Sequence, residues 1–169
     1  MSTQLSTSLL RAGAADERLS LSLLQRLAGH VQRRPDAPAI VDSPSGRTLT
    51  FAELVAAAHR VANALRAQGL PEGDGVAYAL PNDVDAVIWQ LATNEIGLRY
   101  LTLNTSLSAD EFISILEHSG AAALATQADY LDRFTAVPDG TRLRIVVGDS
   151  PGIPAGFVAE SDFLAGQPT

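Results

Sequence analysis

The chain has 169 residues, about the length of one domain, and 46% of them are hydrophobic, which is enough for one core and too many for a disordered tail. Twelve basic and 19 acidic residues give a net charge of −7, which argues against nucleic acid or an anionic membrane surface as a partner. All twelve basic residues are Arg and Cys is absent, so Lys catalysis, thiolate nucleophiles, Cys metal sites and disulfides are excluded.

Apolar residues recur at helical spacing in the first half of the chain and predict two helices separated by a hairpin. In chain order, the expected segments are a helix from Asp16 to Pro35, strands at 37–42 and 47–51, and a helix from 50 to 69. The second helix opens with Thr50 and Glu53, whose three-residue spacing is that of a capping box. Residues 1–15 contain no long apolar run and are expected to form a flexible terminus.

The second half of the chain alternates short apolar segments with helical patterns. The expected strands are 76–80, 100–104, 121–126 and 142–148, and the expected helices are 83–96, 109–119 and 129–134. Asn82 is the expected N-cap of the first of these helices, and Ser108 with Glu111 forms a second capping box. Alternating strands and helices imply crossover connections, so residues 16–148 are predicted to be an α/β subdomain with a mostly parallel sheet and flanking helices.

The segment from 149 to 169 is rich in Gly and Pro and has little periodicity, so it is predicted to be a truncated linker. Upstream, the single Trp of the chain, Trp89, lies at the margin of the apolar face of its helix. Packing at the edge of the core is favoured for this residue. Contact with another domain or with a second chain, which would make the protein a homo-oligomer, is left open.

The candidate catalytic and binding motifs each have a simpler structural explanation. Gly69, Gly73 and Gly75 precede a strand, whereas a dinucleotide-binding loop follows one, so they are interpreted as a turn. The segment VVGDSPGIPAG (146–156) does follow a strand, but it has no Lys and contains two prolines where a helix should begin. The three histidines are not at metal-ligand spacing, and no nucleophile elbow is present. We therefore predict no catalytic residue and no metal ligand in this span.

Three groups of residues, in this order, resemble the start of the adenylate-forming (AMP-binding) acyl-CoA synthetase superfamily. They are RPDAPAIVD with RTLTFAEL (34–54), ANALRAQGLPEGDGVAYALPN (62–82) and IGLRYLTLNTSLSADEFISILEHSGAAALAT (96–126). Fatty-acyl-CoA ligases look most similar, because LNTSLSADE resembles their strand exit and capped helix. Aryl-acid ligases and the adenylation domains of peptide synthetases stay open as alternatives.

The resemblance implies that the chain is an incomplete part of the large N-terminal domain of an adenylate-forming enzyme. The intact enzyme would use ATP, Mg²⁺ and CoA to convert a carboxylic acid, expected to be a fatty acid, to an acyl-adenylate and then to acyl-CoA. The Lys-containing phosphate loop and the later adenylate-binding motifs of the family are absent, so the chain alone is expected to be inactive and to bind none of these cofactors. In parts of the family the loop after the 100–104 strand lies near the CoA entrance, which makes Asn104, Thr105 and Ser106 the candidate residues of that edge.

Two classes of function follow from these observations. In the first, the chain is an N-terminal fragment of a cytoplasmic acyl-CoA ligase, and its partner is the remaining part of the AMP-binding domain. In the alternative, it is a stand-alone, non-catalytic binding or interaction module derived from such an enzyme. The Gly- and Pro-rich end, treated as a cut linker, favours the first class. No apolar run is long enough to predict a membrane span.

Overall fold

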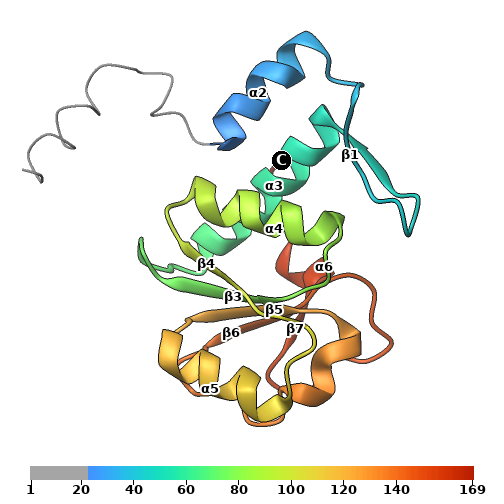
Figure 1. The fold of residues 1–169 in the computed structure, drawn as a ribbon. Coiled ribbons are helices and arrows are strands. Elements are labelled where there is room, and N and C mark those ends of the chain that lie inside the picture. The colour runs from blue at the N-terminus through green and yellow to red at the C-terminus, as the bar shows by residue number, and fades with distance from the viewer. Residues whose placement is uncertain (1–22) are drawn as a thin grey trace, which may run out of the picture.

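The computed structural model describes residues 23–169, which form a parallel sheet with helices on both faces (Figure 1). In chain order the elements are α2 (Leu23–Arg33), β1 (Pro38–Val41), β2 (Thr48–Thr50), α3 (Phe51–Ala67), β3 (Gly75–Ala79), α4 (Val84–Glu95), β4 (Arg99–Thr102), α5 (Ala109–Ser119), β5 (Ala123–Thr126), the 3₁₀ helix η2 (Ala128–Arg133), β6 (Leu143–Val146), β7 (Val158–Ala159) and α6 (Glu160–Phe163). The α/β class predicted from the sequence is confirmed. The predicted flexible terminus and the start of the first helix lie outside the described residues.

The strands of the main sheet run in the order β4-β3-β5-β6-β7, and every neighbouring pair is parallel. Helices α3 and α4 lie on one face of the sheet, and α5 with η2 lies on the other (Figure 1). The chain leaves β3 for α4 on the first face, and it leaves the adjacent β5 for η2 on the second face. The connections therefore diverge between β3 and β5, at the topological switch point where parallel sheets form ligand crevices.

The central strands are built from small apolar residues because both of their faces are covered. Every residue of β3 (GVAYA) and of β5 (ALAT) is buried, as expected for strands between two helical layers. At Gly75 the backbone comes so close that a Cβ atom there would lie 3.2 Å from the Cα of Ala121. The absence of a side chain at Gly75 therefore permits this close packing of neighbouring segments.

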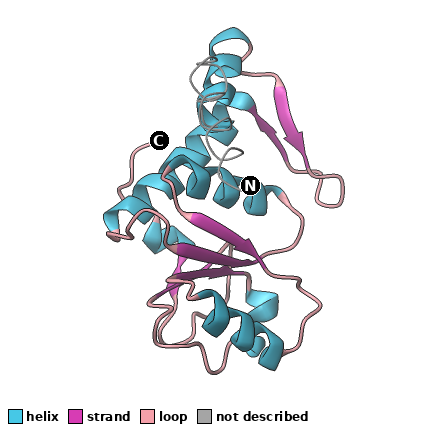
Figure 2. Cartoon of the chain, turned by 60° about the vertical axis from the view of Figure 1, so that its left-hand side comes forward, coloured by secondary structure: helices cyan, strands magenta, loops and turns pink. Residues whose placement is uncertain are grey.

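The hairpin predicted from the sequence is confirmed as a separate two-stranded antiparallel sheet, β1 with β2. Together with α2 it lies at the α3 and α4 side of the molecule, away from the main sheet (Figure 2). The ring of His30 on α2 stacks on Phe51 at the start of α3, with 4.9 Å between the ring centroids. The guanidinium of Arg34 also lies over Phe51, 4.8 Å from its centroid. His30 therefore joins α2 to α3.

Both predicted capping boxes are present. At the start of α3 the N–H of Thr50 donates to Glu53 Oε2 at 2.9 Å, and the N–H of Glu53 donates to Thr50 Oγ1 at 3.2 Å. The same reciprocal pair joins Ser108 and Glu111 at the start of α5. The hydrogen bond from the Thr50 backbone lowers the pKa of Glu53, because it favours the ionised carboxylate.

Helix α4 differs from the prediction at its first residues. Its N-cap is Asp83 rather than Asn82, and the Asp83 carboxylate accepts a hydrogen bond from the N–H of Ala86 at 3.0 Å. Both residue types are good N-caps, so the sequence pattern could not separate two neighbouring candidates. The helix begins at Val84, one residue later than expected.

The predicted linker over 149–169 is corrected for residues 158–163, which belong to the folded body. Strand β7 pairs with β6, with Val158 opposite Ile145 and Ala159 opposite Val146. Phe163 of α6 is only 7% exposed and packs against Trp89. A two-residue strand and a four-residue helix are too short to show a hydrophobic period, so the sequence pattern did not reveal them.

Replacing Thr50 with Ala should lower the free energy of unfolding by about 1 kcal/mol, because the side-chain acceptor for the N–H of Glu53 is lost. Replacing Thr50 with Ser keeps the acceptor oxygen and serves as the matched control. Urea denaturation of the two variants and the wild type measures the effect. Equal losses in the two variants would contradict a capping role for the hydroxyl.

Candidate functional site

The carboxyl ends of the parallel strands bring four connecting segments to one edge of the sheet. These segments are 80–83 after β3, 103–108 after β4, 127–128 after β5 and 147–149 after β6. Parallel α/β sheets bind ligands at this edge, beside the strands whose connections diverge. The carboxyl edge of the sheet, centred on the ends of β3 and β5, is therefore the candidate functional site of the described residues.

Two side chains close the crevice between β3 and β5. The Nε2 amide of Gln127, just after β5, donates to Asp83 Oδ2 at 2.9 Å. The other oxygen, Asp83 Oδ1, accepts the hydrogen bond from the N–H of Ala86 that caps α4. Both oxygens of the carboxylate thus have protein donors. At the switch point, Asp83 therefore caps α4 and connects it to the segment after β5.

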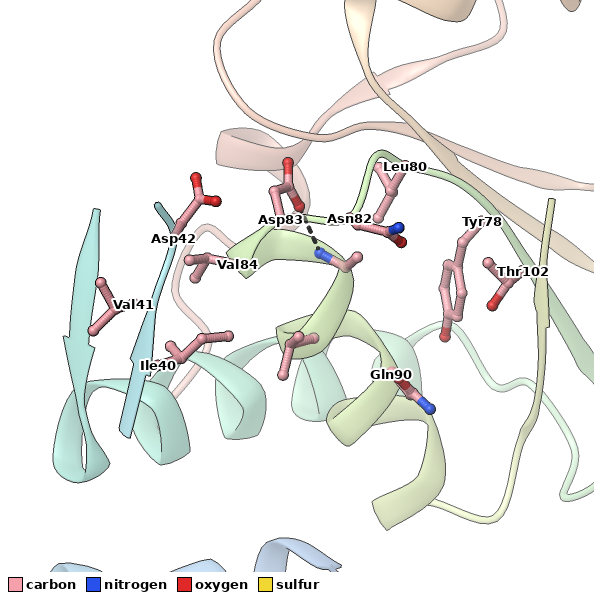
Figure 3. A pocket seen from close by; sticks show the side chains of 12 residues that line it. Ile40, Val41, Asp42, Tyr78, Leu80, Asn82, Asp83, Val84, Gln90 and Thr102 are labelled. Carbon is pink, nitrogen blue, oxygen red and sulfur yellow. Dashed lines mark hydrogen bonds between the residues drawn. The ribbon is translucent and has the colours of Figure 1, made fainter. Parts of the chain in front are cut away.

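A cavity of about 290 Å³ adjoins this crevice, between the hairpin and α4 (Figure 3). Its wall is mostly apolar and includes Ile40, Val41, Leu80, Val84 and Val87, while its polar lining residues include Asp42, Asn82, Gln90 and Thr102. Figure 3 shows the aromatic ring of Tyr78 between Gln90 and Thr102. The cavity can hold apolar groups, with amide and hydroxyl groups available at its polar positions.

The hydroxyl of Tyr78 is committed to the core rather than to this cavity. It is hydrogen-bonded to the hydroxyl of Thr93 and donates to the backbone carbonyl of Trp89 at 3.2 Å. Burial raises the pKa of Tyr78 far above its ordinary value, because the charged phenolate would lose its hydration. Tyr78 therefore stays protonated at neutral pH and is not a general base.

The three candidate residues at the CoA edge form one compact turn after β4. Asn104 Oδ1 accepts from the N–H of Ser106 at 3.0 Å, and the carbonyl of Asn104 accepts from the N–H of Leu107 at 3.0 Å. Asn104 and Ser106 are exposed, and Thr105 is half-buried. The turn can offer hydroxyl and amide groups to a polar ligand, but it carries no group suited to acid–base catalysis.

Arg133 of η2 fixes this turn from the side. Its guanidinium donates to the carbonyls of Thr105 and Leu107, the latter at 3.0 Å. The same guanidinium lies over the rings of Phe112 and Tyr130, with centroid distances of 5.9 and 5.4 Å. Hydrogen bonds and cation–π contacts therefore hold the turn in one conformation against α5 and η2.

In the loop after β6, the backbone N–H of Gly148 already has a hydrogen-bond partner. The N–H of Gly148 donates to Glu160 Oε2 at 2.9 Å. A phosphate loop needs its N–H groups free for an anion, and here a carboxylate already takes this position. The N–H of Gly148 is therefore not free to bind an anion in this conformation.

Glu160 also accepts a hydrogen bond from Nε1 of Trp89 at 2.9 Å, across 71 residues of sequence. Burial raises the pKa of Glu160 because the charged carboxylate is desolvated, and the donors Gly148 and Trp89 oppose that effect. More weakly, the nearby Asp85 raises the pKa and Arg47 lowers it. Trp89 itself is fully buried, and the acceptor of its indole N–H lies in the C-terminal segment of its own chain.

The other residues singled out in the sequence are the histidines and the glycines before β3. The histidines lie on separate helices, and the glycines form a turn. The three histidines lie on three different helices, α2, α3 and α5. Gly69 and Gly73 adopt left-handed φ angles of 66° and 85° in the turn before β3, which supports the turn interpretation. Within residues 23–169, no group of three or more His, Cys, Asp or Glu could hold a metal ion. Over the same residues, no helix is long and apolar enough to cross a membrane.

Sequence reasoning missed the contacts that organise this edge. Asp83 and Gln127 are 44 residues apart, and Arg133 acts on carbonyls 26 and 28 residues away. Local spacing carries no signal for such pairs. The one available signal was Trp89, because a buried indole N–H needs an acceptor.

Comparison with known proteins places the sequence among AMP-binding enzymes: residues 27–162 match the family model described as "AMP-binding enzyme". Enterobactin synthase component F of Escherichia coli O157:H7 is 35% identical over 117 residues, which are 69% of this chain and 9% of that protein. Feruloyl-CoA synthase of an Amycolatopsis species is 33% identical over 119 residues, 66% of this chain and 24% of that protein. The chain spans a quarter or less of the length of the curated relatives that it matches.

Solved structures share the fold. The anthranilate CoA ligase AuaEII, in complex with anthranoyl-AMP, superposes with a TM-score of 0.77 at 22% identity over 88% of this chain and 28% of that chain. The O-succinylbenzoate coenzyme A synthetase MenE of Bacillus subtilis, in complex with ATP and magnesium ion, has a TM-score of 0.62 at 26% identity. That similarity covers 85% of this chain and 34% of the MenE chain.

The raised pKa of Glu160 predicts a pH-dependent stability. A carboxyl group whose pKa is raised on folding contributes stability below its unfolded value, and that contribution is lost as the pH rises through the folded value. Replacing Glu160 with Gln removes this titration, so the difference in free energy of unfolding, variant minus wild type, should increase as the pH rises from about 4.5 towards neutrality.

Urea denaturation across this range measures the difference. The titrations of Glu53 and Glu111 also change stability with pH, but they contribute equally to the variant and the wild type and cancel in the difference. Asp162→Asn, at an exposed position of the same helix, is the control. A difference that stays constant or falls with pH would contradict the assignment to Glu160.

Proposed function

Because the chain belongs to the AMP-binding enzyme family, we propose that it is the N-terminal part of an ATP-dependent ligase that converts a carboxylic acid to an acyl-adenylate and then to acyl-CoA. The observation that carries the proposal is the match of residues 27–162 to the family. The shared fold with CoA ligases supports it. Since the chain spans only a small part of its relatives, catalysis is assigned to the intact protein.

ATP and Mg²⁺ are the cofactors proposed for the intact enzyme, with CoA as the acyl acceptor. Two groups at the carboxyl edge already have protein partners. The N–H of Gly148, which could face a phosphate, donates to a carboxylate, and both oxygens of Asp83, which could face a metal ion, accept hydrogen bonds. The chain also has no Lys to bind a phosphate. The proposal therefore places nucleotide and metal binding on residues outside this chain, and the described part provides the scaffold.

The acid substrate is proposed to be a fatty acid, and an aryl acid is the second candidate. The segment LNTSLSADE (103–111) and its resemblance to fatty-acyl-CoA ligases favour the first. The names of two relatives, feruloyl-CoA synthase and 4-chlorobenzoate–CoA ligase, favour the second. Cytoplasmic location and homo-oligomer formation stay predictions.

The turn at Asn104, Thr105 and Ser106 is proposed to form one edge of the CoA entrance. Its support is the geometry described above. Two of the three residues are exposed at the carboxyl edge, and Arg133 holds the turn in place. The polar groups of the turn suit hydrogen bonds to a polar ligand, and its ordered backbone reduces the entropy cost of binding.

The isolated 169-residue chain should form no acyl-adenylate, because the residues proposed to bind nucleotide phosphate lie outside it. Pyrophosphate release with ATP, Mg²⁺ and a panel of fatty and aryl acids measures this directly. The longer native product that contains this segment is expected to form acyl-CoA from a fatty acid or from an aryl acid. The acid class that it uses decides between the two substrate proposals. Acyl-adenylate formation by the isolated chain would contradict the placement of catalysis. A longer product inactive with both classes would contradict the ligase proposal.

A further inference from the structure

The C-terminal arm, defined here as residues 148–164, has few backbone attachments to the sheet. Its strand β7 pairs with β6 through only two residues on each side. Between the two strands, residues 151–156 are all exposed. Segments with short ladders and exposed backbone open at lower free energy than the core of the same protein. The position of the arm therefore depends strongly on its side-chain contacts.

One carboxylate makes the decisive contacts. Glu160 accepts from the N–H of Gly148, where the arm begins, and from Nε1 of Trp89 on α4, each at 2.9 Å. The first bond closes the arm into a loop, and the second fixes that loop to the helical layer above the sheet. Loss of this side chain would leave the N–H groups of Gly148 and Trp89 without their acceptor, so the docked position of the arm depends on it.

Two further contacts depend on the same docking. The ring of Phe163 stacks on Trp89, with centroids 5.8 Å apart and planes inclined by 16°. The carbonyl of Leu164 accepts from the guanidinium of Arg60 on α3 at 3.3 Å. Both contacts lie within four residues of Glu160, so they belong to the same docked segment.

The docked arm borders a cavity of about 440 Å³ that is also lined by Arg60 of α3. Its lining includes Arg60, Gly148, Ser150, Glu160, Ser161 and Leu164, so most of the wall belongs to the arm itself. Figure 1 shows the arm running from β6 to α6 at the edge of the sheet. Displacement of the arm would dismantle this cavity and uncover Trp89.

We infer that the C-terminal arm opens and closes as a unit over this cavity while the sheet stays folded, and that Glu160 is the residue that holds it closed. The inference does not depend on the proposed function, because it follows from contacts within residues 60–164. Glu160 is thus a positioning residue: it sets the place of the arm relative to α4.

Native-state hydrogen exchange of the 169-residue chain tests the inference without any substitution. The amide of Leu164, which donates to the Glu160 carbonyl at 2.8 Å, should exchange through an opening that leaves the β3 and β5 amides protected. We expect its protection factor to be lower than theirs by a factor of about 100 or more. Equal protection at the two places would overturn the inference.

Substitution at Glu160 tests its part in the opening. Glu160→Ala should increase arm exchange at least about tenfold, with little change in β3 and β5, because two hydrogen bonds to the carboxylate are lost. Glu160→Gln keeps one carbonyl acceptor and should give a smaller increase. Asp162→Ala, at an exposed position of the same helix, should give none.

Fluorescence of the single Trp provides a second readout. The emission of Trp89 should shift to longer wavelength in Glu160→Ala, because the open arm lets water reach the indole. Equal increases in exchange over the arm and the central strands would show global destabilisation and overturn the inference. If the Ala variant does not fold, the wild-type exchange measurement decides alone.

Discussion

The N–H of a fully buried indole needs a hydrogen-bond acceptor. In this fold the acceptor is a carboxylate in the C-terminal arm, so the hydrogen bond connects that arm to helix α4. Trp89 is 0% exposed, and its Nε1 donates to Glu160. Leaving such a donor unpaired would cost about 1–3 kcal/mol, a large fraction of the stability of a domain. Tyr78 meets the indole edge-on from β3, and Phe163 stacks on it from α6. The central strand, helix α4 and the C-terminal arm therefore share one aromatic cluster.

The parts of the fold that could be predicted from the sequence are those specified by nearby residues. Thr50 with Glu53 and Ser108 with Glu111 fix two helix starts through contacts only three residues apart. The apolar runs of β3 and β5 indicate strands covered on both faces. From these local signals the α/β class and the parallel sheet follow.

The rest depends on pairs that are distant in sequence. Gln127 reaches Asp83 across 44 residues, and Glu160 reaches Trp89 across 71. Such contacts leave no periodic pattern, and for that reason residues 158–163 were expected to be linker. Local signals also gave no preference between Asn82 and Asp83 as the cap of α4, since both side chains are suited to that position.

At the carboxyl edge, the polar groups mostly satisfy one another. Asp83 binds Gln127, Arg133 binds two carbonyls of the turn after β4, and Gly148 binds Glu160. An edge satisfied in this way suits a scaffold, and it agrees with the proposal that the reacting groups of the ligase come from residues outside this chain. The turn at Asn104 offers exposed polar groups at this edge, and the cavity beside α4 offers a mostly apolar wall with a few polar residues.

The length of the native product decides between the fragment of a ligase and the stand-alone module. An antibody raised to residues 23–169 would identify that product in an extract of the source cells, and its mass can be read by immunoblot and mass spectrometry. We expect a species far heavier than the 17.7 kDa of this chain. A single species at 17.7 kDa would contradict the assignment to a larger ligase and would identify the chain as a free-standing module.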